Sequence, residues 1–233
     1  MLLHEAYIHV QQGLQNIAAF VYRNVELPEL DYFWNKGTDK FIHLAIPNLD
    51  DDVRDERFSS IQASLDDLRV LTVRNASLVS LSNEITTGGY TYKQGILPTE
   101  YRHLLNDRTI VSPVVPCNPA KTAEVPNRLT KQDNLFNILE NSLHKTSINS
   151  PVSKIDGNIL TVYNTYKGQK QFNIENVLID YIKAPVKVAY STPTNPTLEF
   201  PDNVCFKIID TTLLYIMKVS EQNPNKIQFL SKS

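Results

Sequence analysis

The chain has 233 residues, of which 42% are hydrophobic and 21% are charged, a composition that is ordinary for a globular protein. Its formal net charge of −2 argues against a nucleic-acid binder that neutralises phosphates over a whole face. The sequence contains no apolar run of about eighteen residues, and the segment after Met1 lacks the basic and apolar regions of a signal peptide. We therefore expect neither a membrane span nor a secretory leader.

The N-terminal part predicts helices. Apolar residues recur at helical spacing from about Leu2 to Val25, and a second apolar-periodic stretch begins at Pro28 and ends at Pro47. Pro28 suits a first helical turn, and the acidic residues beside it suit the positive end of the helix dipole. Because the link between the two helices is short, we expect an antiparallel helical hairpin.

The middle of the chain carries mixed signals. We expect a third helix around Phe58 to Leu68, a weakly indicated strand between Leu71 and Ile85, and a turn at Gly88-Gly89. Further helices are predicted over Pro98 to Asn106 and Thr130 to His144. The stretch between these two, at about 112–126, is proline-punctuated and predicts a loop or extended arm.

From Ser150 the pattern changes to strands. Asp156-Gly157 between apolar runs is a hairpin signal, Lys167-Gly168 marks a second turn, and a strand begins at Phe172. Val186 to Tyr190 alternates once more. A closing helix is predicted from about Pro201 to Glu221, followed by a short tail.

This order of elements predicts an α+β fold. We expect a mainly helical region at 1–149 that includes the proline-rich arm, and a small antiparallel sheet with a C-terminal helix at 150–233. The sheet and the helix of the second region are expected to pack as one unit.

The standard catalytic and phosphate-binding motifs are absent from the sequence. The best metal candidate is the acidic run Asp50-Asp51-Asp52 with Asp55 and Glu56. It lacks the glycine and the ligand alternation of a calcium loop, so a solvated helix-entry segment is the favoured interpretation.

Other chemically competent residues are isolated in the sequence. Cys117 lies beside Pro116 with no identifiable His/Asp partner, and Cys205 lies far from it, so the two cysteines fit neither a disulfide framework nor a metal site. Asp66 and Asp67 are adjacent and would diverge on a helix, which favours solvent exposure of both. The histidines show no ligand-like pairing, and they are His4, His9, His43, His103 and His144. We therefore expect no catalytic, cofactor-binding or metal-binding residues.

The tyrosines are more suggestive. The chain has eleven, and Tyr90, Tyr92 and Tyr101 fall in its middle part. Aromatic residues of this kind are favoured at protein interfaces, although ordinary core packing is the more common role.

Two groups of segments carry a resemblance to a known family. Near the N-terminus they are His4–Gln15, Asp31–Lys36 and Lys40–Ile42, and near the C-terminus they are Ile179–Val188, Leu198–Pro201 and Ile208–Asp210. The recognisable half is a "Y-I-K-x-P" strand followed by "L-E-x-P" and a closing helix. Together these segments resemble the neck proteins of crAss-like phages that infect Bacteroidetes. These are packing motifs without catalytic content.

The resemblance implies a structural virion protein, located in the neck, that forms a homo-oligomeric ring of twelvefold symmetry between head and tail. Its implied partners are copies of itself, the portal protein and adjacent neck or tail rings, with genomic DNA passing through without sequence-specific binding. One alternative is another virion component, such as a head-completion or tail-adaptor protein. A second alternative is a small enzyme with a nonstandard site around the acidic run or Cys117.

Overall fold

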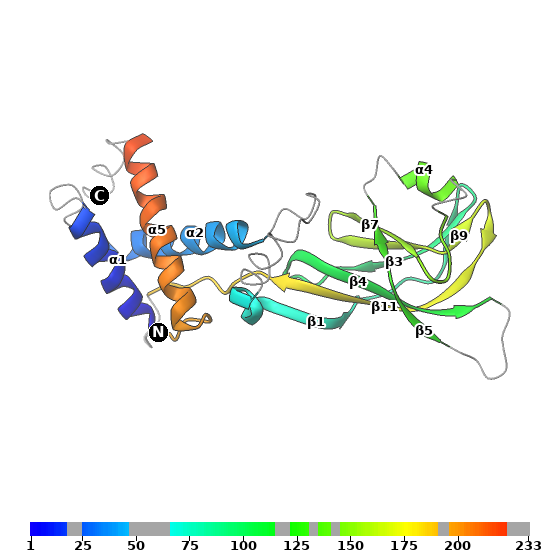
Figure 1. Ribbon diagram of the computed structural model, residues 1–233, viewed down its shortest axis with the longest axis horizontal. Coiled ribbons are helices and arrows are strands. Elements are labelled where there is room, and N and C mark those ends of the chain that lie inside the picture. The colour runs from blue at the N-terminus through cyan, green and yellow to red at the C-terminus, as the bar shows by residue number, and fades with distance from the viewer. Residues whose placement is uncertain are drawn as a thin grey trace, which may run out of the picture. The chain divides into compact units, whose positions relative to one another are not determined.

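The computed structural model describes residues 1–17, 25–46, 66–114, 122–130, 135–140, 145–190 and 196–222. The chain forms two compact units (Figure 1). The first, which we call the helical unit, comprises Met1–Leu71 and Pro185–Ser233. The second, the sheet unit, comprises Thr72–Ala184. This division differs from the expected boundary at 149/150, because both chain ends contribute to one unit and the middle of the chain forms the other.

The helical unit contains three long helices and a short 3-10 turn among its described residues. Their bounds are α1 Leu3–Ile17, α2 Leu27–Ala45, η1 Arg69–Leu71 and α5 Asp202–Gln222. The start of α2 is stabilised by the Glu26 N–H, which donates to the Glu29 carboxylate at 3.2 Å, and Pro28 occupies the first turn. The predicted second and closing helices are therefore confirmed, while the predicted third helix lies mostly outside the described residues.

Helices α1 and α2 pack mainly against α5. At the crossing of α2 and α5, Gly37 lies so close to Thr212 that an added Cβ would be 2.0 Å from the Thr212 hydroxyl. The buried side chains of the three helices include Leu3, Tyr7, Val10, Leu14, Leu30, Trp34, Ile42, Val204, Ile208 and Ile216. The core of this unit is therefore built from both ends of the chain. The sequence predicts a hairpin formed by the first two helices alone.

The sheet unit contains a four-stranded antiparallel sheet in the order β1-β11-β4-β5. Its strands are β1 Thr72–Ser77, β4 Tyr101–Pro113, β5 Ala123–Pro126 and β11 Phe172–Lys183. The two longest strands, β4 and β11, pair along most of their length, from Phe172 opposite Pro113 to Lys183 opposite Tyr101.

A five-stranded sheet has the order β2-β3-β8-β7-β6, and only the β6–β7 pair is parallel. Its strands are β2 Ile85–Thr87, β3 Tyr90–Ile96, β6 Arg128–Leu129, β7 Val152–Asp156 and β8 Ile159–Tyr163. The predicted turn at Gly88-Gly89 and the predicted Asp156-Gly157 hairpin are confirmed, since all three glycines have positive φ. A short hairpin, β9 Thr165–Tyr166 with β10 Gln169–Lys170, turns at Lys167-Gly168 as predicted, and α4 spans Leu135–Glu140.

The core of the sheet unit draws on both sheets. Strand β8 contributes Leu160 and Val162, which are fully buried, and β11 contributes alternate residues along its length. The other buried members are Leu78, Leu97, Leu104, Val111, Phe172, Ile174, Val177, Ile179 and Tyr181. Because side chains alternate between the two faces of a strand, the opposite face of β8 is left for another role.

The predicted helix-rich α+β fold with a small C-terminal sheet is therefore wrong, because the described chain is predominantly β. The main error concerns Pro98 to Asn106, predicted as helix, where the long strand β4 begins at Tyr101. Pairing with β11, which lies about seventy residues later, overrides the local pattern. The described ends of the predicted arm at 112–126 also belong to β4 and β5, which pair with each other.

Candidate functional site

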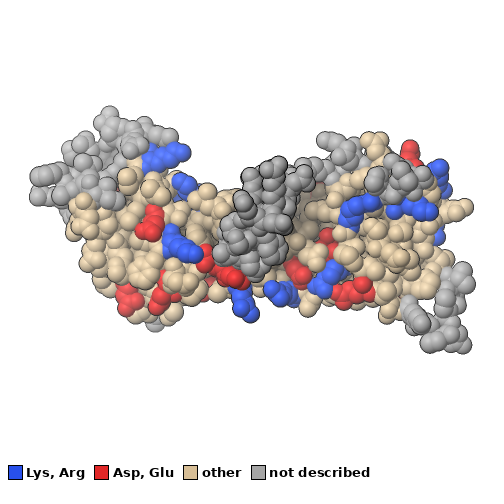
Figure 2. Space-filling model, in the orientation of Figure 1, with Lys and Arg blue, Asp and Glu red and all other residues tan. Residues whose placement is uncertain are grey.

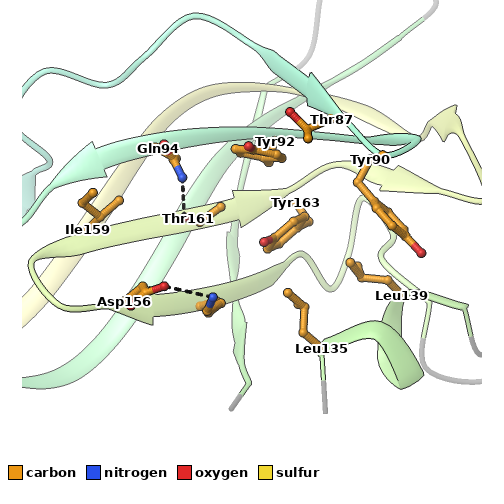
Figure 3. A pocket seen from close by; sticks show the side chains of 12 residues that line it. Thr87, Tyr90, Tyr92, Gln94, Leu135, Leu139, Asp156, Ile159, Thr161 and Tyr163 are labelled. Atoms are coloured by element: carbon orange, nitrogen blue, oxygen red, sulfur yellow. Dashed lines mark hydrogen bonds and ion pairs between the residues drawn. The ribbon is translucent and has the colours of Figure 1, made fainter. Parts of the chain in front are cut away.

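A cleft of about 490 Å³ lies on the outer face of the five-stranded sheet (Figure 3). Strand pairing arranges its lining residues in rows. Tyr92 on β3 is opposite Tyr163 on β8, and Tyr163 is opposite Val152 on β7. The lining residues are Thr87, Gly88, Tyr90, Tyr92, Gln94, Leu135, Leu139, Lys154, Asp156, Ile159, Thr161 and Tyr163. We call this feature the tyrosine cleft.

Aromatic rings form one end of the tyrosine cleft. The ring centroids of Tyr92 and Tyr163 are 5.4 Å apart, and the ring planes are inclined at 50°. Burial raises the pKa of the Tyr163 hydroxyl, and the neighbouring Tyr92 and Asp156 raise it further. The Tyr163 hydroxyl therefore stays protonated near neutral pH and can donate and accept hydrogen bonds.

Helix α4 closes the same end of the cleft. Leu135 and Leu139 are buried and pack with Val152, while Tyr90 and Tyr163 pack against this group. The Tyr90 hydroxyl donates to Glu140 at 3.1 Å, which ties β3 to the end of α4. Within the predicted helix over Thr130 to His144, the six described residues of α4 are helical. Its two buried leucines form a wall of the cleft.

The other end of the cleft combines polar side chains with Ile159. The Gln94 side-chain amide donates to the Thr161 hydroxyl at 3.3 Å, and Lys154 forms an ion pair with Asp156 at 3.2 Å. Figure 3 shows Gln94 and Thr161 on the neighbouring strands β3 and β8, whereas Lys154 and Asp156 both lie on β7. The Lys154 side chain is 12% exposed, whereas that of Asp156 is 65% exposed. Hydrogen-bond donors and acceptors therefore face the same space as the tyrosine rings.

A second set of contacts lies in the helical unit and joins two segments that carry the sequence resemblance. Asn35 of α2 contacts the backbone of Val188 twice: its side-chain amide donates to the Val188 carbonyl at 2.9 Å, and its carbonyl accepts from the Val188 N–H at 3.1 Å. One turn earlier, Asp31 accepts from the Tyr190 N–H at 3.0 Å and from the Tyr7 hydroxyl. The segment at 186–190, predicted as a strand, pairs with these side chains rather than with a strand.

The residues singled out by sequence fall in different places. The acidic run at 50–56, Cys117 and His144 lie outside the described residues. Asp67 is not solvent-exposed as predicted, because its side chain is only 16% exposed and pairs with Lys207 of α5 at 2.5 Å. Cys205 is buried, and burial raises the pKa of its thiol to about 11, so it is unreactive near neutral pH.

Within the described parts of the chain, no three His, Cys, Asp or Glu side chains are close enough together to hold a metal ion. Among the helices described, none is long and apolar enough to cross a membrane. Neither finding extends to the acidic run at 50–56.

Comparison with protein-family models and with curated protein sequences finds no match for this chain.

The cleft was only partly foreseeable from sequence. Tyr90 and Tyr92 were singled out as interface candidates, but Tyr163, Gln94 and Thr161 were not. The available signal is the alternation in Ile159-Leu160-Thr161-Val162-Tyr163, which assigns two residues to the core and three to the opposite face. Only the strand order shows that this opposite face adjoins Tyr92.

Proposed function

We propose that this chain is a structural virion protein that forms a ring in the head-to-tail neck of a tailed phage. The observation that carries the proposal is the convergence of most resemblance segments in the helical unit, while Ile179–Lys183 belong to β11 of the sheet unit. Tyr7, Asp31 and Asn35 come from the N-terminal segments, and Val188 comes from the C-terminal ones, and they share one hydrogen-bonded contact set. These four residues of the resemblance segments thus help to hold the helical unit together.

The LEFP segment belongs to the same unit. The Val186 N–H donates to Glu199 at 3.3 Å, the Cys205 thiol donates to the Phe200 carbonyl at 3.4 Å, and the Leu198 N–H donates to the Met1 carbonyl at 3.1 Å. These contacts link the start of α1, the extended segment and the start of α5. Such contacts explain the residues of these segments by their packing role, without any catalytic role.

A ring subunit needs two different surfaces that meet in neighbouring copies. The helical unit exposes apolar side chains that could contribute to such surfaces, with Leu44 on α2 70% exposed and Leu214 on α5 60% exposed. On the face shown in Figure 2, basic and acidic side chains are interspersed within each unit. This distribution is compatible with a conduit through which DNA passes without being bound tightly.

Cryo-electron microscopy of purified particles of the phage that encodes the chain tests this proposal. We expect a ring of this subunit, twelvefold, directly below the portal protein, with both units recognisable in each copy. Peptide mass spectrometry of the same particles shows whether they contain this chain. Absence of the chain from the particles would contradict a virion role, and density elsewhere in the particle would favour the head-completion or tail-adaptor alternative.

A matched pair of variants tests whether the exposed face of α5 takes part in assembly. Leu214→Glu should leave the unfolding temperature within a few degrees of the original, because surface substitutions cost within about 0.5 kcal/mol, while reducing ring formation with the portal protein. Gln15→Glu, an exposed change of equal charge on α1, is the control. Native mass spectrometry of the mixtures gives the ring population, and equal populations for both variants would exclude Leu214 from the interface.

A further inference from the structure

The tyrosine cleft is not used by the packing contacts that support the neck assignment. From its geometry we propose that the cleft is a binding site for a neutral carbohydrate, in the form of a short oligosaccharide. This inference rests on the sheet unit alone and does not depend on the proposed neck function.

The cleft has the size and mixed lining of a small-molecule site. Its volume of about 490 Å³ falls within the range of roughly 300–1,000 Å³ that ligand pockets occupy. Its floor is rigid, because Thr161 and Lys154 lie on adjacent, fully paired strands and Thr161 is only 4% exposed. A ligand would therefore meet a preformed surface.

The two ends of the cleft match the two kinds of surface that a sugar presents. The faces of the Tyr92 and Tyr163 rings carry partial negative charge and attract the weakly positive C–H groups of a pyranose face. At the other end, the Gln94 amide and Thr161 hydroxyl can each donate and accept hydrogen bonds, which is what sugar hydroxyls require. An alkyl ligand would leave the remaining hydrogen-bonding positions of these two groups unused, at a cost in affinity.

Charge favours a neutral ligand. The lining contains one cation, Lys154, and one anion, Asp156, which already pair at 3.2 Å. A single-stranded nucleic acid would need unpaired cations along its path in addition to stacking rings. The paired charges can instead each accept or donate a hydrogen bond to a hydroxyl group.

The position of the cleft also disfavours an extended peptide. Peptides that bind sheets usually add a strand at an open edge and use backbone hydrogen bonds. The tyrosine cleft is centred on β8, which pairs with β3 on one side and β7 on the other, while β2 and β6 cover part of the outer sides of β3 and β7. Recognition must therefore occur through side chains that project from the sheet face.

The test uses the full-length chain and four neutral probes, maltotriose, cellotriose, chitotriose and xylotriose, with tyrosine-ring NMR signals as the readout. We expect at least one probe to bind with a Kd on the order of 1 mM or tighter and to shift the Tyr92 and Tyr163 signals. Tyr163→Ala and Gln94→Ala should each weaken binding about tenfold, while Tyr163→Phe should retain the stacking and most of the affinity.

Tyr166→Ala is the matched control, because Tyr166 lies in the same unit but outside the cleft lining, next to Lys145 and Lys167. It should change the affinity less than twofold. Circular dichroism verifies that each variant is folded. If Tyr163→Ala does not fold, Gln94→Ala still tests the proposal. Three results would overturn the proposal: no binding of any probe at about 10 mM, binding that Gln94→Ala leaves unchanged, or tighter binding of chondroitin sulfate or oligothymidine than of every neutral probe.

Discussion

Individual polar residues hold the two sheets of the sheet unit together. Asp107 on β4 is 3% exposed and accepts a hydrogen bond from the Asn127 side chain at 2.7 Å. Asn127 also accepts from Thr109 at 2.6 Å and donates its N–H to the Asp107 carbonyl at 3.0 Å. Asn127 lies between β5 and β6, where the chain passes from the first sheet to the second, so this buried network secures the crossing.

The buried Asp107 carboxyl should make stability pH-dependent. Burial raises its pKa above the ordinary value of 3.8, and the hydrogen bond from Asn127 counters part of the rise. The native state therefore binds the proton more tightly than the unfolded state. The resulting stabilisation is complete below the unfolded-state pKa and is lost as the pH rises through the folded-state pKa.

We expect the Asp107→Asn substitution to remove this dependence. The free energy of unfolding of the variant, relative to the original protein, should increase as the pH rises from about 4. Urea titrations at several pH values, followed by the circular dichroism of the β-sheets, measure this difference. A difference that is constant with pH, or that decreases as the pH rises, would contradict the argument.

At the scale of elements, the close approach of α2 and α5 depends on Gly37. An added Cβ would lie 2.0 Å from the Thr212 hydroxyl and 2.9 Å from the Thr212 Cα, and a backbone atom cannot move away without shifting the helix. Glycine has a low helix propensity, so by this measure alone Gly37 is a weak point of α2. In the structure it is the residue that allows α2 to cross α5 at short distance.

Gly37→Ala should therefore destabilise the helical unit by about 1–3 kcal/mol through overpacking, despite a helix-propensity gain of about 1 kcal/mol. Trp34, the only tryptophan and 3% exposed, reports unfolding of this unit by fluorescence. Gly13→Ala is the matched control, since its Cβ would meet the end of the flexible Leu213 side chain at 2.6 Å. A loss for Gly37→Ala no larger than that for Gly13→Ala would contradict the prediction.

At the scale of the whole molecule, the two units differ in how the chain builds them. The sheet unit is one continuous segment with a core of its own, whereas the helical unit needs both chain ends. Residues 1–71 alone would lack α5, the helix on which α1 and α2 pack.

We expect residues 72–184 expressed alone to fold and unfold cooperatively with the circular dichroism of a β protein. Residues 1–71 expressed alone should not show cooperative unfolding, because their apolar faces would stay exposed. Urea titration of the two fragments makes the comparison. An unfolded 72–184 fragment would show that the sheet unit depends on the helical unit.

The sequence by itself determined the features that depend on neighbouring residues. The helix with Pro28 in its first turn, the closing helix and the glycine turns at Gly88-Gly89 and Asp156-Gly157 were all predictable, because caps and turns act over a few residues. The alternation in the strand that begins at Phe172 was readable for the same reason.

Only the tertiary structure decided which distant segments pair. The strand at Tyr101–Pro113 carries a local pattern that resembles a short helix, and its pairing with β11 overrides that pattern. Tertiary structure also decides that α5 packs against α1 and α2. Strand order likewise makes Tyr92 and Tyr163 neighbours. Partner choice between strands and helices depends on burying complementary apolar faces from remote parts of the chain, and local spacing carries no information about it.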